Sequence, residues 1–247
     1  MENNKNKNVI ITGGSRGIGK AIARKMLELG YNVFICGRNK EELKKTKQEF
    51  ILSGEIDYFV LDISDKEAVK NFTAQWNRPL YGLINNAGAW KEERIDELEK
   101  DVWDEMINLN LSGLYFLTKG LYPKITMPGR IINISSQLGL NGRAGFGPYS
   151  AAKHGVNGLA KCWAEELGEK GITVNSICPG WVKTQSNIDE IHVFAQAEGK
   201  TFNEKFKEIS DTCLMKRLIE PEEVANLAAF LMSGEASGIC GKIYEIK

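Results

Sequence analysis

The chain of 247 residues lacks the features of several specialised protein classes. No apolar run approaches the length of a membrane span, and residues 1–8 are polar, without the apolar segment of a secretion signal. Lysines and arginines together equal the acidic residues, 32 of each, so charge suggests neither a nucleic-acid partner nor a membrane surface. From these absences we expect a cytoplasmic protein with neither of those partners.

Cysteine and histidine are also too sparse to suggest a metal centre. There are five cysteines, none at CxxC spacing, and two histidines, His154 and His192. We therefore expect reduced thiols and no metal site. The hydrophobic fraction of 43% and the length allow a large core without disulfides or metal.

Short apolar runs alternate with longer amphipathic segments along the whole chain. The runs expected to form strands are Val9–Thr12, Val33–Cys36, Tyr58–Leu61, Leu83–Asn85, Ile131–Ser135, Thr173–Cys178 and Lys242–Ile246. The segments expected to form helices are Ala21–Leu29, closed by Gly30, then Glu41–Phe50, Lys66–Trp76, Val102–Leu121, Ser150–Glu169 and one opened by Pro221. This alternation predicts a single α/β domain over residues 1–247. We expect a Rossmann-type, doubly wound parallel sheet of about seven strands with helices on both faces.

One stretch interrupts the pattern. Lys183–Thr212 is polar, with short apolar islands, and we interpret it as an irregular insertion before the last helix. Long insertions in compact domains are usually functional. We therefore predict a substrate loop or lid at residues 183–212.

A glycine-rich turn follows the first expected strand and opens the first helix. It reads Thr12-Gly13-Gly14-Ser15-Arg16-Gly17-Ile18-Gly19. Gly13 would permit the tight turn, Gly17 the approach of backbone to a pyrophosphate, and Gly19 close packing of helix on strand. The helix N-terminus would present free amides to the phosphates. Strand, glycines and helix in this order predict a dinucleotide site that includes Gly13, Ser15, Arg16, Gly17, Ile18 and Gly19.

The end of the second strand bears on the choice of dinucleotide. NAD is preferred where an acidic residue there binds the ribose 2′-hydroxyl. This chain has Gly37 at that position, followed by Arg38, with Arg16 in the glycine turn. Two guanidinium groups suit a 2′-phosphate, so the sequence favours NADP over NAD.

Tyr149 and Lys153 stand one helical turn apart, where an ammonium can stabilise a phenolate and lower the tyrosine pKa. Tyr115 and Lys119 share that spacing, so the spacing alone decides nothing. Tyr149, however, is preceded by a strand that ends at Ser135 and Ser136, which places a hydroxyl at the edge where ligands bind in open α/β sheets. We predict that Ser136, Tyr149 and Lys153 are catalytic and that Tyr115–Lys119 is structural.

Other polar and glycine-containing segments are expected at the same edge. They are Asn86-Ala87-Gly88 after the fourth strand, and Pro179-Gly180 after the sixth, leading to Thr184. Backbone and amide groups there could line a cofactor. Asn110 lies in the helix before the serine strand. On its own it is equally well explained as a capping amide.

Six segments in this order give the chain a clear resemblance. With them the chain resembles the short-chain dehydrogenase/reductase family over essentially its whole length. The segments are TGGSRGIG (12–19), NNAG (85–88), NLNLSG (108–113), INISS (132–136), YSAAK (149–153) and PGWVKT (179–184). The resemblance implies an NADP(H)-dependent enzyme acting on CH–OH groups and carbonyls. Members with a basic residue after Gly37 usually prefer NADP, in agreement with the charge argument.

The resemblance also implies roles for single residues. Tyr149 would be the general acid in reduction and the base in oxidation, and Lys153 would lower its pKa and hold the nicotinamide ribose. Ser136 would bind the substrate oxygen, with Ser135 as its structural neighbour. Asn110 would hold a water in the proton path. In addition, Asp62, at the end of the third strand, resembles the family's adenine contact.

Substrate and assembly are less defined. The chain resembles 3-oxoacyl-carrier-protein reductases, which implies an acyl-thioester substrate and a candidate acyl-carrier-protein partner. Such reductases dock the carrier protein with two basic residues. The corresponding positions in this chain resemble Met127 and Lys170, of which only Lys170 is charged. The chain is also similar to 3-hydroxybutyrate dehydrogenases and aromatic polyketide ketoreductases. We expect a homodimer or homotetramer, although the C-terminus lacks the Gly-Gly pair that many tetrameric members have.

The resulting prediction is a carbonyl reductase that acts on a 3-oxoacyl thioester or similar ketone. The alternatives are a dehydrogenase of a small hydroxy acid, sugar or other secondary alcohol, and a non-catalytic dinucleotide sensor or scaffold. The walls of a substrate pocket are expected from Trp90, Phe146, Trp181 and the loop around Ile188. A role of these aromatic side chains in packing alone is an equal alternative.

Overall fold

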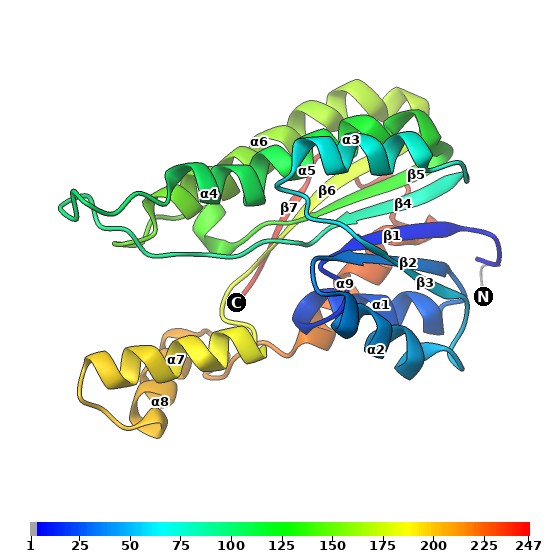
Figure 1. Ribbon diagram of the computed structural model, residues 1–247. Coiled ribbons are helices and arrows are strands. Elements are labelled where there is room, and N and C mark those ends of the chain that lie inside the picture. Colours follow the sequence, from blue (N-terminus) through cyan, green and yellow to red (C-terminus); the bar gives the residue numbers. More distant parts are fainter. Residues whose placement is uncertain (1–3) are drawn as a thin grey trace.

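A seven-stranded parallel sheet forms the centre of the computed structural model, which describes residues 4–247 (Figure 1). The strands are β1 (Asn8–Thr12), β2 (Asn32–Gly37), β3 (Ile56–Val60), β4 (Leu80–Asn85), β5 (Ile125–Ile134), β6 (Ile172–Pro179) and β7 (Ile243–Ile246). Their order is β3-β2-β1-β4-β5-β6-β7, and every neighbouring pair is parallel. All seven expected apolar runs overlap these strands, with bounds that differ by a few residues. This confirms the predicted fold class.

Helices cover both faces of the sheet. Their bounds are α1 (Gly17–Glu28), α2 (Lys40–Phe50), α3 (Lys66–Gln75), α4 (Trp103–Ile107), α5 (Gly113–Leu121), α6 (Gly147–Leu167), α7 (Gln185–Ala197), α8 (Phe202–Thr212) and α9 (Pro221–Met232). Short 3₁₀ turns are η2 (Tyr122–Lys124), η3 (Gln137–Gly139), η4 (Gly168–Lys170) and η5 (Gly234–Ala236), and a π-helical turn, η1 (Asn108–Ser112), joins α4 to α5.

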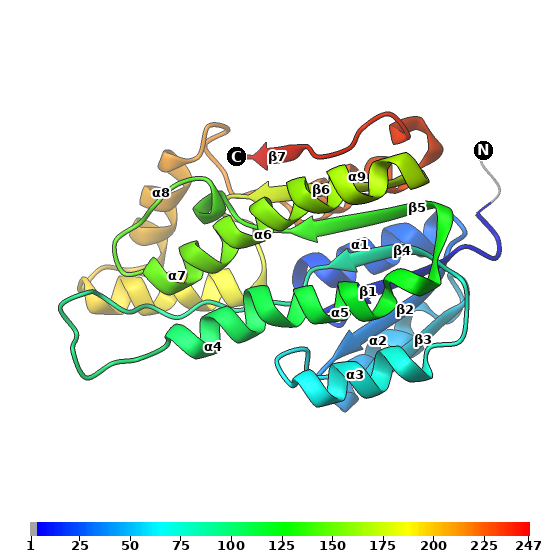
Figure 2. The same ribbon diagram turned by 90° about the horizontal axis from the view of Figure 1, so that it is seen from above.

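The two faces have separate hydrophobic cores. Helices α1, α2 and α9 lie on one face of the sheet, and α3, α5 and α6 lie on the other (Figures 1 and 2). Their apolar side chains form one core on each face. Both faces are covered, so β1, β4 and β6 are buried along their whole length. This explains why these strands are apolar without alternation.

The chain changes direction at β1. It runs outward through β2 and β3, then returns to place β4 on the other side of β1. The carboxyl ends of β1 and β4 therefore mark the topological switch point, where open α/β sheets bind their ligands. The Thr12 hydroxyl joins the two ends here, since it accepts hydrogen bonds from the backbone amides of Asn86 and Ala87, both at 2.9 Å.

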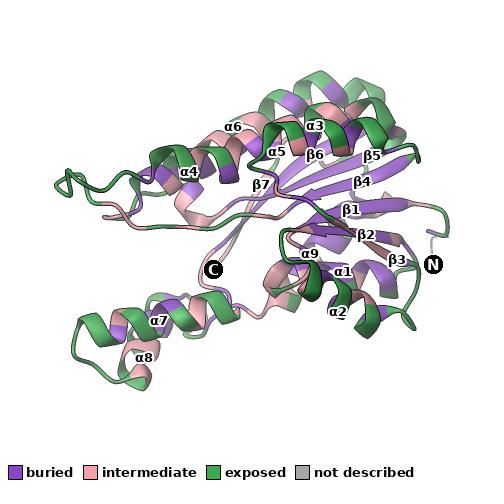
Figure 3. Ribbon diagram, viewed as in Figure 1, coloured by how far each residue is buried: buried purple, intermediate pink, exposed green. Residues whose placement is uncertain are grey.

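The prediction of an irregular stretch at Lys183–Thr212 is wrong, because most of it folds into α7 and α8. The Thr184 hydroxyl caps α7, and Thr201 and Glu204 form a capping box on α8. The two helices extend beyond the carboxyl edge of the sheet, with much of their surface exposed (Figure 3). The apolar islands meet each other rather than the sheet, through Ile191 and Ile209 among others.

Candidate active site

The glycine turn has the geometry that a phosphate-binding loop requires. Gly13 and Gly17 have φ angles of +67° and +52°, a region that favours glycine. A Cβ on Gly19 would lie 2.2 Å from the carbonyl oxygen of Gly13, so only glycine allows this packing. No side chain caps the N-terminus of α1. Its first amides therefore remain available for an anion.

The Asn86 side chain fixes the turn to the end of β4. Its amide donates to the carbonyl oxygens of Thr12, at 2.9 Å, and Gly13, at 3.3 Å. A Cβ on Gly13 would approach Ala87 Cα to 3.1 Å. The structure thus brings the predicted segments Gly13–Gly19 and Asn86–Gly88 together.

Arg16 and Arg38 are exposed, and neither forms an ion pair or side-chain hydrogen bond with the rest of residues 4–247. Each follows the end of one of two paired strands, since Thr12 of β1 pairs with Cys36 of β2. Ser15, by contrast, has its hydroxyl 3.4 Å from a carboxylate oxygen of Glu42, to which it donates. Sequence reasoning did not foresee this contact between the turn and α2.

Asp62 follows β3, next to β2 in the sheet. Its carboxylate accepts hydrogen bonds from the backbone amide and hydroxyl of Ser64, at 2.9 and 2.7 Å. This turn holds the carboxylate at the same edge as the glycine turn. The adenine contact stays a prediction.

Ser136 lies just beyond the end of β5 and caps η3, its hydroxyl accepting from the Leu138 amide at 3.1 Å. It is close enough to Tyr149 to oppose the rise in that residue's pKa. Ser135 is buried, and its hydroxyl donates to the Lys153 carbonyl oxygen at 3.1 Å. The first serine therefore anchors α6 to the sheet, and the second faces the phenol.

Lys153 is 4% exposed, and its ammonium donates to the Ile134 carbonyl oxygen at 3.0 Å. The nitrogen lies 5.6 Å from the centre of the Tyr149 ring. Burial lowers the pKa of Lys153 to about 8, since a charged amine loses its hydration there. The pair thus joins a buried lysine to a half-buried tyrosine near the end of β5.

The expected direction of the Tyr149 pKa is wrong in this structure. Burial raises the pKa of Tyr149 to about 12, and negative charge at Glu190 acts in the same direction. Desolvation of the phenolate outweighs the stabilising effect expected from the nearby lysine. The phenol is therefore protonated at neutral pH, the form that a general acid needs.

Asn110 lies in the π-helical turn η1, which interrupts the expected Val102–Leu121 helix. The side-chain amide donates to the carbonyl oxygens of Met106 and Ala89, at 3.0 and 2.8 Å. A Cβ on Gly88 would lie 2.6 Å from Asn110 Oδ1 and 3.4 Å from Lys153 Nζ. Asn110, Gly88 and Lys153 therefore meet at one point, and π-turns of this kind are frequent at functional sites.

Pro179 ends β6, and the chain continues through Gly180 to Thr184 at the start of α7. A Cβ on Gly17 would meet the Thr184 methyl group at 3.2 Å, so this segment packs against the glycine turn. The predicted cofactor residues at both ends of the site are thereby brought together.

Aromatic side chains and three charged groups border the site on the side of α7. The ring centres of Trp90 and Phe146 are 5.6 Å apart. The Arg143 guanidinium lies over the rings of Phe146, Trp181 and Phe194, at 4.8, 5.5 and 5.3 Å. Sequence reasoning predicted three of these aromatics but missed Arg143, Glu92 and Glu190, because nothing local marks a charged residue on a polar helix or loop as part of a site.

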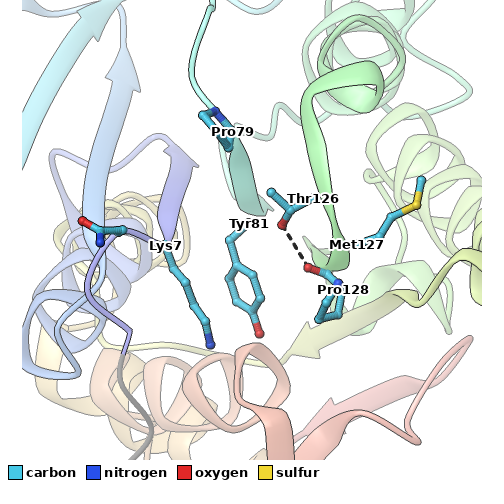
Figure 4. A pocket seen from close by; sticks show the side chains of 7 residues that line it. Lys7, Pro79, Tyr81, Thr126, Met127 and Pro128 are labelled. Carbon is cyan, nitrogen blue, oxygen red and sulfur yellow. Dashed lines mark hydrogen bonds between the residues drawn. The ribbon is translucent and has the colours of Figure 1, made fainter.

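The positions expected to dock a carrier protein lie elsewhere. Met127 is in the first part of β5 and Lys170 precedes β6, at the amino ends of the strands, whereas Tyr149 is beyond the carboxyl ends. Met127 lines a pocket of about 210 Å³ with Tyr81 and Pro79 (Figure 4). The Lys170 ammonium donates to the Tyr122 hydroxyl at 2.8 Å. Within one chain, neither position borders the catalytic edge.

No helix within residues 4–247 is long and apolar enough to cross a membrane. In the same part of the chain, no three His, Cys, Asp or Glu side chains gather as a metal site would require.

Comparisons with known proteins agree with this site. The profile of the short-chain dehydrogenase family matches residues 7–192. An acetoacetyl-CoA reductase of Rhizobium meliloti is 39% identical over 94% of this chain and 93% of its own length. The 3-oxoacyl-(acyl-carrier-protein) reductase FabG of Thermotoga maritima is 32% identical over 96% of this chain and 94% of its own. A crystal structure of an actinorhodin polyketide ketoreductase variant with NADPH has a TM-score of 0.92 and 30% identity, covering 100% of this chain and 97% of that one.

The chain therefore belongs to the short-chain dehydrogenase/reductase family and is an oxidoreductase that uses a nicotinamide dinucleotide. This finding decides against the non-catalytic sensor or scaffold that the sequence left as an alternative. It does not by itself choose a substrate.

Proposed function

We propose that the protein is an NADPH-dependent reductase of 3-oxoacyl thioesters or similar ketones, with Tyr149 as the general acid. The observation that carries the proposal is the meeting of buried Lys153 with half-buried Tyr149 and Ser136 at the carboxyl edge, beside the glycine turn. The second pair with the same spacing, Tyr115–Lys119, has no such surroundings.

The residues fit a nicotinamide dinucleotide. The uncapped start of α1 and the close packing of Gly13 and Gly19 form a cradle that a Cβ would fill. Asp62 would contact the adenine. The rest of the cofactor would be held by residues of the glycine turn and of the segments after β4 and β6: Gly13, Ser15, Arg16, Gly17, Ile18, Gly19, Asn86, Ala87, Gly88, Pro179, Gly180 and Thr184. The cofactor supplies the hydride.

Arg16 and Arg38 support the choice of NADPH. Both guanidinium groups are exposed and free of carboxylate partners within the described chain, so both can pair with a 2′-phosphate. The NADPH in the solved actinorhodin ketoreductase variant is consistent with this choice.

In reduction, the Ser136 hydroxyl would donate to the substrate carbonyl oxygen and orient it. Tyr149 would deliver the proton to that oxygen as the alcohol forms. Lys153 would hold the nicotinamide ribose and, with a water kept by Asn110, return a proton to the phenol. Burial of Tyr149 suits this direction, because its raised pKa keeps the phenol protonated. In oxidation the same phenol would be the base.

We further propose an acyl-thioester substrate, with an acyl carrier protein as candidate partner, and a homodimer or homotetramer in solution. The relatives named as acetoacetyl-CoA and carrier-protein reductases support the thioester. The helices α7 and α8 extend beyond the catalytic edge from Thr184, a position from which they could contact a substrate.

The test is NADPH consumption by the purified protein with acetoacetyl-N-acetylcysteamine, a thioester with a pantetheine-like arm. We expect rapid consumption with NADPH, slower consumption with NADH, and none with the Tyr149→Phe protein. Absence of consumption despite NADPH binding would overturn the thioester assignment and turn attention to free ketones and sugars. Addition of an acyl carrier protein thioester then tests the partner.

A further inference from the structure

One buried charge in the molecule has no place in the reaction described above. Glu190 lies in α7 and is 6% exposed, yet no residue from 4 to 247 donates a hydrogen bond to its carboxyl group or forms an ion pair with it. Its carboxyl oxygens are not among the atoms that are fully buried without a partner, so solvent still reaches them. An ionised carboxyl group that is partly desolvated and unpaired is costly. Such a group is retained where it serves a purpose, and binding of a ligand is a common one.

The position of Glu190 points toward the substrate rather than the protein core. Thr184, which caps α7, packs against the glycine turn, so α7 crosses the carboxyl edge beside the cofactor site. Phe194 is one turn further along α7, on the same face as Glu190. Arg143 covers the rings of Phe194 and Phe146, and Phe146 lies one turn before Tyr149.

Several charged groups act on Glu190. Its charge acts on Tyr149 of α6. Arg143 attracts its ionised form and Glu92, from the loop after β4, repels it. On α8, Lys205 and Glu208 form an ion pair at 3.5 Å. Together with Arg143 and Trp181 they line a pocket of about 400 Å³. On α7 itself, Asp189 is exposed and accepts from Gln185.

We propose that Glu190 is a substrate-binding residue that selects by charge: it admits carbonyl substrates with hydrogen-bond donors, such as amide N–H or hydroxyl groups, and rejects carboxylates. This inference rests on the proposed function, because it concerns the substrate of the same site. It favours thioesters and amides over the small hydroxy acids that the sequence left as an alternative.

The physical reason is repulsion between like charges. A substrate carboxylate beside Glu190 would either meet a second negative charge or force Glu190 to hold a proton. Burial raises the pKa of Glu190 to about 8, so the repulsion grows as pH rises from 6 towards 9. An amide at the same place can donate to the carboxyl oxygen in either protonation state.

The test compares acetoacetate with acetoacetamide, which differ by one charge and by two N–H donors. Binding is measured by tryptophan fluorescence in the NADP⁺ complex, where no reduction can occur. At pH 9, where Glu190 is ionised, we expect the wild type to bind acetoacetamide at least about tenfold more tightly, a difference of ~1.4 kcal/mol. Glu190→Gln should reduce the ratio to near one, and the wild-type ratio should increase with pH.

Asp189→Asn is the matched control, because it removes one charge from the same helix at an exposed position. Its ratio should equal that of the wild type. Equal binding of the two ligands by the wild type, binding of neither, or an equal response of both variants would overturn the inference. Because this readout needs no turnover, loss of NADPH oxidation with normal selectivity would count only against the proposed reductase function.

Discussion

Two tyrosine–lysine pairs in this chain have the same spacing and nearly the same geometry, yet only one of them is placed for catalysis. The lysine nitrogen lies 5.6 Å from the ring centre in Tyr149–Lys153 and 5.7 Å in Tyr115–Lys119. Lys153 is buried, however, whereas Lys119 is exposed. Surroundings, rather than the spacing of the pair, therefore distinguish a site from an ordinary helix surface.

The two pairs have different neighbours in the fold. Tyr149 follows β5 and Ser136, and the Lys153 ammonium is held by the Ile134 carbonyl oxygen. Tyr115 stacks on Trp163, with ring centres 6.2 Å apart, and packs within the core on one sheet face. The first pair meets the switch point of the sheet, and the second fills the space between α5 and α6.

The largest expected difference between the pairs concerns their lysines. Lys153→Met should lower kcat by about 10³-fold, within the range usual for losing general acid–base support. Lys119→Met should leave kcat within about twofold, because an exposed cation near a ring contributes little. Steady-state NADPH oxidation measures both, and circular dichroism checks folding. A similar loss in both variants would show that the comparison is mistaken.

A smaller effect is expected at the adenosine end of the site. Arg38→Ala should raise the Kd for NADPH by about 10–100-fold, since a charged hydrogen bond contributes about 1.5–3 kcal/mol. The Kd for NADH should change by less than about twofold, because NADH has no 2′-phosphate. Fluorescence titration with each cofactor gives both constants. Equal weakening of the two would contradict the role of Arg38.

The aromatic border should affect substrate rather than chemistry. Trp181→Ala should raise KM for the thioester by about three- to tenfold, in line with aromatic contacts of about 0.5–1.5 kcal/mol. Trp163→Ala, beside the structural pair, serves as the control and should affect thermal stability more than KM. An unchanged KM for Trp181→Ala would mean that this side chain only packs.

The last prediction concerns stability rather than binding or turnover, and is a change in how stability depends on pH. The folded-state pKa of Glu190 is about 8, above its ordinary value, so the folded state holds a proton that the unfolded state has released. The free energy of unfolding should therefore fall as pH rises from the ordinary glutamate pKa to about 8, by at most about 1.4 kcal/mol per pH unit. Thermal unfolding of Glu190→Gln should show its largest gain in Tm near pH 8.5 and almost none near pH 5. A constant gain would contradict the burial of this charge.

Much of the fold could be predicted because parallel strands covered on both faces are mainly apolar, without regular polar alternation. The runs at Val9–Thr12 and Thr173–Cys178 lie in strands that are fully buried. The glycine turn could be predicted equally well, because the backbone angle requires glycine at Gly13 and close packing requires it at Gly19. These features depend on local sequence and on the period of the pattern.

What could not be predicted depends on contacts between distant residues. α7 and α8 were missed because they lie outside the alternation of strands and helices, and their apolar residues pack on each other instead of on the sheet. The direction of the Tyr149 pKa was wrong because burial, which no local sequence reveals, outweighs the nearby lysine. Glu190 was missed because only the folded chain brings its charge near Tyr149. Arg143 was missed because only the folded chain places it over Trp181 and Phe194.

The most direct test compares NADPH oxidation by the wild type, Tyr149→Phe and Tyr115→Phe with acetoacetyl-N-acetylcysteamine at saturating NADPH. We expect Tyr149→Phe to lose at least about 10³-fold in kcat, with its Kd for NADPH nearly unchanged, because only the proton donor is removed. Tyr115→Phe should retain wild-type turnover within about twofold. Retained turnover in Tyr149→Phe, or loss in Tyr115→Phe alone, would contradict the assignment of the active site.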